Sequence, residues 1–154
     1  MDVQFDPVGP GDANTLLMLA GVFHREEGHP LTAAGERALA RIAAGEPFAP
    51  AWIVRQANEA VGYLVITLGF SVEYGGRDGF IDDLYLVPKA RGQGIGPKLL
   101  SFALSQAAAL GINTLHLEVE TDNERAARLY QRAGFEATGR MLMRCHVKSA
   151  IGPR

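Results

Sequence analysis

The sequence predicts an α+β fold in which helices flank a mixed, mainly antiparallel sheet. Helix-like and strand-like segments alternate along a chain of 154 residues, and 47% of the residues are hydrophobic. That length and that content fit one domain with a substantial core. The chain has no linker, repeat or low-complexity tract. We therefore expect residues 1–154 to form a single domain.

Helix signals occur at four places. Asp12 or Asn14 can cap a first helix and Thr32 a second, each ahead of apolar residues at helical spacing. A third helix follows the glycine loop as "PKLLSFALSQAAAL", and a fourth is predicted in "NERAARLYQRA". A glycine lies near the end of each segment, where a helix commonly ends: Gly28, Gly45, Gly111 and Gly134.

Strand signals occupy the remaining segments. The runs "AWIVRQ" and "AVGYLVITLGFSVEY", joined through Asn58, are typical of paired strands. After a turn in "GGRDG", the stretch "FIDDLYLV" is rich in β-branched and aromatic residues, and "NTLHLEVE" predicts a further strand. "FEATG" and "RMLMRCHVK" predict a closing hairpin, in which Cys145 would be a small core residue.

Composition argues against several classes of function. The formal net charge of -2 gives no general attraction to nucleic acid. The N-terminal "MDVQFDPVGP" lacks the pattern of a signal peptide, and no segment has the apolar length of a membrane span. A single cysteine cannot form an internal disulfide, and the histidines show no metal-ligand spacing. These features predict a cytoplasmic protein without a metal site.

The stretch "RGQGIGPKLL" places glycines directly before a helix, a pattern that lets backbone amides approach an anion. It is not a P-loop. A dinucleotide site is the nearest alternative, with Gly92, Gly94 and an acid at Glu118 or Glu120. However, the third glycine falls one position early, at Gly96, and "PKAR" separates the glycines from the strand.

Two blocks together resemble the GNAT superfamily of acyl-CoA-dependent N-acetyltransferases. "VPKARGQGIG" fits the family signature [RQ]-x-x-G-x-[GA] with Arg91, Gly94 and Gly96 in register. "LEVETDNERAARLYQRAGF" fits the second block, and the blocks span roughly residues 81–135. The resemblance implies a central mixed sheet of six to seven strands, about four helices, and acetyl-CoA as the acetyl donor.

The resemblance also implies a cofactor site. The loop and the first turn of its helix would hold the phosphates, with Lys89 and Lys98 adding positive charge. One strand would bond the pantetheine arm as an added strand does. The residues concerned are Leu84, Tyr85, Leu86, Val87, Arg91, Gly92, Gln93, Gly94, Ile95, Gly96, Pro97, Asn123 and Tyr130.

Acetyl transfer needs a neutral amine, and an alkyl amine with a pKa near 10.4 is about one part in a thousand neutral at pH 7. A general base is therefore useful. By resemblance, Glu118 and Asp82 are nearly equal candidates for that base, and Tyr130 is the acid that protonates the leaving thiolate. Asp82 and Asp83 should point to opposite faces of their strand.

The expected acceptor is a small primary amine with a further positive charge. Glu26 and Glu27 end the helix that covers the acceptor side in the family, while Glu73, Asp82 and Asp83 flank the strands that lead there. Alternatives are acetylation of a protein or peptide N-terminus or lysine, and a non-catalytic acyl-CoA sensor. The acceptor would be a small molecule rather than nucleic acid or membrane, and a homodimer is possible.

Overall fold

The computed structural model describes residues 2–148 and contains a five-stranded sheet in the order β1-β2-β3-β4-β5. The first four strands pair antiparallel, and β5 runs parallel to β4. The strands are β1 Val3–Pro7, β2 Ala51–Gln56, β3 Glu59–Ser71, β4 Gly76–Leu86 and β5 Thr114–His116. The helices are α1 Ala13–Glu26, α2 Ala33–Ala43, α3 Ile95–Ala109 and α4 Glu124–Arg132, with short 3-10 turns η1 Pro10–Asp12 and η2 Pro88–Ala90.

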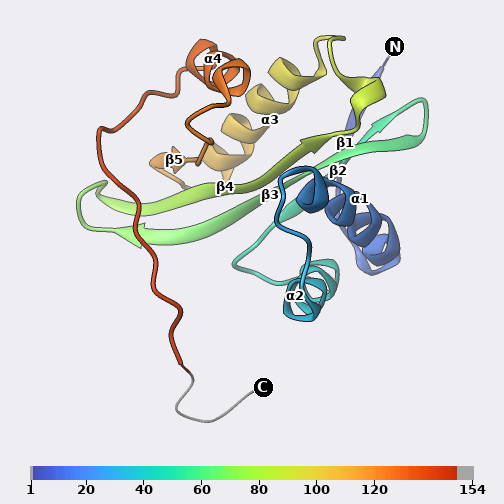
Figure 1. Cartoon of the computed structure of the whole chain (residues 1–154), viewed down its shortest axis with the longest axis horizontal. Helices are drawn as coiled ribbons and strands as arrows, with labels where there is room; N and C mark the ends of the chain where they lie inside the picture. The colour runs from blue at the N-terminus through green and yellow to red at the C-terminus, as the bar shows by residue number, and fades with distance from the viewer. Residues whose placement is uncertain (1, 149–154) are drawn as a thin grey trace.

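Helices cover both faces of the sheet. Figure 1 shows α1 and α2 on one face and α3 and α4 on the other. On the α1 face, Leu16 and Leu19 pack with Tyr63 in one apolar cluster. On the α3 face, Leu99 and Leu100 belong to a second cluster. Because β3 supplies buried residues to both clusters, from Val61 to Ile66, it is the central strand of the core.

Two helices have side-chain caps, of which the one at Thr32 was predicted. The Thr32 hydroxyl accepts a hydrogen bond from Gly35 N at 3.1 Å, and Asn123 Oδ1 accepts one from Ala126 N at 3.1 Å. Asp12 does precede α1, but its carboxylate accepts bonds from Gly9 N and from Arg55 instead of from the helix. The start of α1 is therefore tied to β2 by a charge pair.

The expected strand count was wrong, because the sheet in residues 2–148 has five strands rather than six to seven. Residues 3–7 form the unpredicted edge strand β1. The closing hairpin is absent from residues 136–148, which are exposed and form no strand. The strand in "NTLHLEVE" stops at His116, and the turn after β3 lies at residues 72–75, earlier than "GGRDG" suggests.

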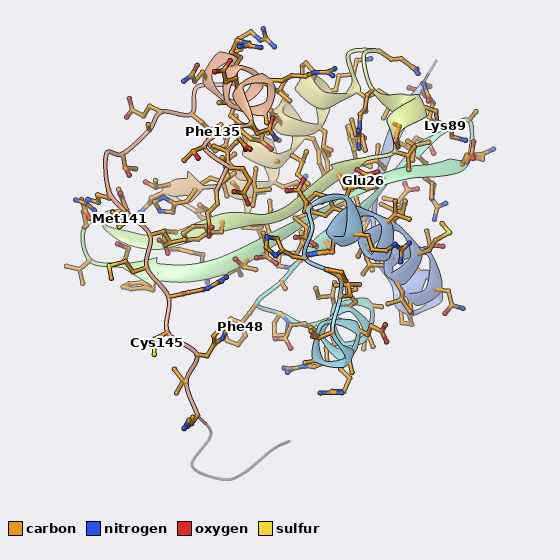
Figure 2. All side chains as sticks on the ribbon, viewed as in Figure 1. Glu26, Phe48, Lys89, Phe135, Met141 and Cys145 are labelled. Carbon is orange, nitrogen blue, oxygen red and sulfur yellow. The ribbon has the colours of Figure 1, made fainter. Side chains whose placement is uncertain are left out.

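An ion pair joins the exposed C-terminal segment to the turn between β3 and β4. The guanidinium of Arg140 donates to both carboxylate oxygens of Glu73, each at 2.7 Å, in the turn between β3 and β4. Figure 2 shows Met141 beside that turn and Cys145 farther along a segment that leaves the sheet. Cys145 is exposed, so its prediction as a core residue was wrong.

Gly62 of β3 lies so close to the β4 backbone that a side chain has no room there. A Cβ atom at this position would lie 2.1 Å from the carbonyl oxygen of Tyr85. We expect Gly62→Ala to lower the free energy of unfolding by about 3 kcal/mol or more, the upper end for overpacking, because backbone cannot move aside cheaply. Chemical denaturation measures the change. Gly11→Ala, whose added Cβ meets no atom within 4 Å, should change stability little; equal effects at the two positions would contradict the steric argument.

Candidate active site

The neighbouring strands β4 and β5 separate after a short paired stretch. They pair at Asp78, Gly79 and Phe80, which face residues 114–116. Beyond this point β4 continues to Leu86, whereas β5 ends. Among residues 2–148, no backbone hydrogen bond joins residues 81–86 to residues 117–120. An edge of β4 is therefore left free to pair with an extended ligand.

A β-bulge lies where the two strands begin to separate. Val65 of β3 faces Asp83, and the next residue, Ile66, faces Ile81, so Asp82 is the extra residue. Bulges re-aim side chains and are common beside active sites. Asp83 packs towards the α1 face, where its carboxylate accepts a bond from the Tyr63 hydroxyl. The two acids thus have different surroundings, although the bulge interrupts the strand alternation on which that expectation was based.

The two candidate bases lie close enough to influence each other. Partial desolvation of the Asp82 carboxyl raises its pKa, although the residue as a whole is exposed. The charges of Asp83 and Glu118 raise this pKa further, while His24 lowers it. Glu118 follows the end of β5 and is exposed. A carboxylate with a raised pKa is a stronger base, so Asp82 is chemically suited to accept a proton.

Tyr130 lies on α4 against the α3-side core. Its ring packs edge-on against Phe135 at a centroid distance of 6.1 Å. Burial raises the pKa of Tyr130, and the charge of Glu27 at the end of α1 raises it further. The phenol therefore stays protonated at neutral pH and can serve as a proton donor. Glu27 and Asn123, the N-cap of α4, line one cavity, so the start of α4 and the end of α1 lie near each other.

The glycine loop before α3 is built to leave its backbone accessible. Gly92 and Gly94 have φ angles of +74° and +80°, and an added Cβ at either position would meet nothing within 4 Å. Gly94 precedes the first turn of α3, where unpaired amides and the helix dipole favour an anion. Pro97 removes one of the amides of this turn. The open backbone and the free edge of β4 fit the phosphates and the extended arm of a coenzyme A molecule.

The Arg91 side chain, at the start of the glycine loop, is bonded within the protein. Its Nε donates to the Leu86 carbonyl at 2.9 Å, and its Nη2 donates to Glu26 at 3.0 Å. Its guanidinium lies 5.6 Å from the centroid of the Tyr85 ring. The Tyr85 hydroxyl donates to the other oxygen of Glu26 at 3.0 Å. One cluster therefore joins the glycine loop, β4 and the end of α1.

An acidic cavity of about 550 Å³ opens at the end of α1. Figure 2 shows Glu26 where α1 approaches β4. Four carboxylates contribute, from α1 and from the segment between β5 and α4, and Asn123 completes the wall on the α4 side. The lining residues are Glu26, Glu27, His29, Glu120, Asp122 and Asn123. Carboxylates around one cavity create a negative potential that attracts cations.

Several other predicted site residues pack in the core or bond other residues of the protein. The Ile95 side chain is 2% exposed in the core, and an added Cβ on Gly96 would contact Leu129 of α4 at 3.5 Å. Gln93 bonds Gln56 and the Lys89 carbonyl. Lys89 itself pairs with Glu59 at 2.6 Å, so Lys98 is the more available cation of the two in the described chain. Leu84, Leu86 and Val87 are partly buried in the core, so only their backbone groups suit the predicted pantetheine contact.

Three groups near this site were missed by sequence reasoning. His24 and Tyr63 both contact Asp83, and Asp122 lines the acidic cavity. Nothing local marks His24 or Tyr63, because Asp83 is 59 and 20 residues away from them. Conversely, Glu73 was expected near the acceptor, but it lies in the β3–β4 turn, bonded to Arg140.

Comparison with known proteins agrees with this geometry. A family model described as Acetyltransferase (GNAT) family matches residues 18–135. The peptidyl-lysine N-acetyltransferase YjaB of Salmonella typhimurium is 35% identical over 95 residues, which cover 61% of this chain and 55% of the relative. The thialysine N-epsilon-acetyltransferase of Bos taurus is 35% identical over 94 residues, covering 61% and 50%. The matched part thus spans about half the length of these curated relatives.

Solved structures extend the likeness to nearly the whole chain. An integron cassette protein from the mobile metagenome of Cole Harbour salt marsh has 37% identity and a TM-score of 0.82, with 96% of this chain and 93% of that one covered. AAC(6')-Iy, in complex with a bisubstrate analogue of coenzyme A, shares the fold at 15% identity, with a TM-score of 0.81 and 96% and 100% covered. The family model, the relatives and the divergence of β4 from β5 lead to one conclusion: the chain belongs to the GNAT acetyltransferase family.

Proposed function

We propose that this chain, as one catalytic domain, transfers the acetyl group of acetyl-CoA to a primary amine. The observation that carries the proposal is the separation of β4 from β5 directly beside the exposed glycine loop. Residues 84–87 would pair with the extended arm of the cofactor through backbone groups, while Gly92, Gly94 and Lys98 would face its phosphates. The bound cofactor supplies an acetyl thioester.

The residues around this opening suit direct transfer in a ternary complex. Asp82 or Glu118 would accept a proton from the acceptor amine, because both carboxylates lie beside the opening and act on each other. Tyr130 would protonate the departing sulfur, and Asn123 would orient the start of α4 beside it. Direct attack keeps the reaction to one acyl transfer and requires no covalent enzyme intermediate.

The acidic cavity favours a small amine with at least one further positive charge. Glu27, Glu120 and Asp122 supply its negative potential, while Glu26 shares its charge with Arg91. Asp83 is bonded within the protein, so it would act on the acceptor through its neighbours. The relative named for thialysine acts on an amino acid with a side-chain amine, which supports this class, and the relative named for peptidyl-lysine makes a lysine peptide the alternative acceptor.

A turnover screen with acetyl-CoA tests the proposal. Diamines, polyamines, free amino acids, aminoglycosides and lysine peptides would be compared by the rate of coenzyme A release. We expect a di-cationic small amine to give the highest kcat/KM. If acetyl-CoA binds but no amine is acetylated, the chain is an acyl-CoA sensor; if a neutral or anionic amine is preferred, the acceptor class is wrong.

The charge of the cavity gives a separate prediction. An exposed ion pair contributes about 0.2–1 kcal/mol, so Glu27→Gln should raise the KM of a di-cationic amine by roughly 1.5- to 5-fold. Added salt should raise the same KM, since charges are screened over about 10 Å at 0.1 M salt. Glu36→Gln on α2, an acid outside this cavity, is the matched control. An equal change in both variants would indicate a general charge effect rather than recognition.

A further inference from the structure

A hydrogen-bonded group joins α1 to β4 beside the Asp82 bulge. One carboxylate oxygen of Asp83, Oδ2, accepts a bond from the Tyr63 hydroxyl at 2.7 Å and lies 2.9 Å from His24 Nε2. Tyr63 is fully buried, and the Asp83 side chain is 12% exposed. Asp83 is therefore fixed by the core on one side, and it holds an imidazole on the other.

This contact determines which nitrogen of His24 carries the proton. A carboxylate only accepts hydrogen bonds, so Nε2 must be the donor, and the neutral ring then has its lone pair on Nδ1. Among the hydrogen bonds of residues 2–148, none engages Nδ1, and the His24 side chain is 27% exposed. A histidine acts as a base when a carboxylate holds one ring nitrogen as a donor and the other nitrogen is free to accept a proton.

The His24 ring lies beside β4 at Asp83, the residue next to the bulged Asp82 where β4 and β5 separate. The His24 charge acts on Asp82, which in turn interacts with Glu118. Glu27, the C-cap residue of α1, follows three residues later and lines the acidic cavity. Besides Asp83, the charged groups nearest His24 are therefore Asp82 of β4 and Glu27, three positions along the chain, with Phe23 packed edge-on at 5.1 Å.

We propose that His24 is the base that deprotonates the acceptor amine, with Asp83 and Tyr63 as positioning residues. The proposal rests on the acetyl transfer proposed above, and it adds a third candidate to Asp82 and Glu118. His24 Nδ1 takes one proton from the acceptor ammonium, which frees the nitrogen lone pair. That nitrogen then forms a C–N bond to the acetyl carbon while the C–S bond breaks.

The remaining protons balance through Tyr130 and water. Tyr130 gives its phenol proton to the departing sulfur, and it regains a proton from the nitrogen, which becomes a neutral amide. The imidazolium of His24 returns its proton to water. The net products are the acetylated amine, coenzyme A and one released proton.

The test is His24→Gln, because glutamine keeps an N–H donor near the position of Nε2 but cannot accept a proton. We expect kcat/KM for the amine to fall about 100-fold or more, as on losing a positioned base. The increase of rate with pH that a general base gives should also disappear. The melting shift that acetyl-CoA produces should stay the same, which separates the loss of chemistry from a loss of fold or of cofactor.

His116→Gln is the matched control. His116 also contacts a β4 carboxylate, Asp78, at 3.3 Å, but it packs between Tyr74 and Phe80, outside the proposed site. This variant should keep both the rate and the pH profile. If His24→Gln also keeps both, the His24–Asp83 contact is only a structural link, and the proposal is overturned.

A second measurement tests the arrangement of the His24 ring independently of acetyl transfer. If the wild-type chain acetylates no amine at all, acetyl transfer is wrong, and the ring can still be examined by 15N NMR with His24→Gln for assignment. A neutral ring protonated at Nε2 supports the open Nδ1. A ring protonated at Nδ1 overturns the arrangement whether or not the chain is an enzyme.

Discussion

Tyr130→Phe is expected to lower kcat by about 100-fold or more while acetyl-CoA binding is kept, because the change removes a positioned proton donor and little volume. The leaving thiolate belongs to a thiol with a pKa near 8.5, below that of an ordinary phenol, so proton transfer from tyrosine needs close placement in the transition state. Burial and Glu27 raise the pKa of Tyr130. Activity should therefore persist to higher pH than an ordinary phenol would allow.

Steady-state rates with a saturating amine and a melting curve with acetyl-CoA measure the two parts of this expectation. Tyr74→Phe is the control, since Tyr74 packs against His116 in the turn after β3 and takes no part in the proposed site. An unchanged kcat in Tyr130→Phe would leave Tyr130 with its packing against Phe135 as its whole role.

The helices were predictable because their signals are local. Thr32 caps the helix it was expected to cap, since a cap depends on a few neighbouring residues. Strands depend on partners that are distant in sequence. β1 was missed because "VQFDP" contains an acid and a proline, yet Phe5 faces Val54 on β2 and stacks on Phe102 of α3 at 4.5 Å.

The prediction of a closing hairpin was wrong for the opposite reason. "RMLMRCHVK" has strand-like composition, but such composition only describes how well residues fit a neighbouring strand. In the described residues no strand edge is paired with this segment, and Arg140 is bonded to the β3–β4 turn. Met141 and Met143 consequently remain 85% and 83% exposed.

The candidate site was partly predictable because a glycine loop and a tyrosine block can be recognised by spacing. The connections between its parts cannot be read that way. Arg91 and Glu26, predicted for the phosphates and for the acceptor, bond each other across 65 residues of sequence. The bulge that makes Asp82 an extra residue depends on the register between β3 and β4, which no short motif specifies.

Gly94→Asp is expected to abolish the stabilisation that acetyl-CoA gives the fold. A ligand at about 100 times its Kd raises the free energy of unfolding by roughly 2.7 kcal/mol, which a melting curve detects. The aspartate would fill the open space at the start of α3 and place a negative charge where the helix dipole favours phosphate. Loop and helix would then repel the ligand that the wild-type backbone accommodates.

Backbone strain needs its own control, because Gly94 has a φ of +80° that aspartate adopts at a cost. Gly111→Asp provides it: Gly111 follows the other end of α3, has a φ of +74°, and also offers open space to a Cβ. Both variants impose the same kind of backbone strain on an aspartate, whereas only Gly94→Asp should lose the shift with acetyl-CoA. An undiminished shift in Gly94→Asp would place the cofactor elsewhere, and loss of the shift in both variants would make strain, rather than phosphate repulsion, the cause.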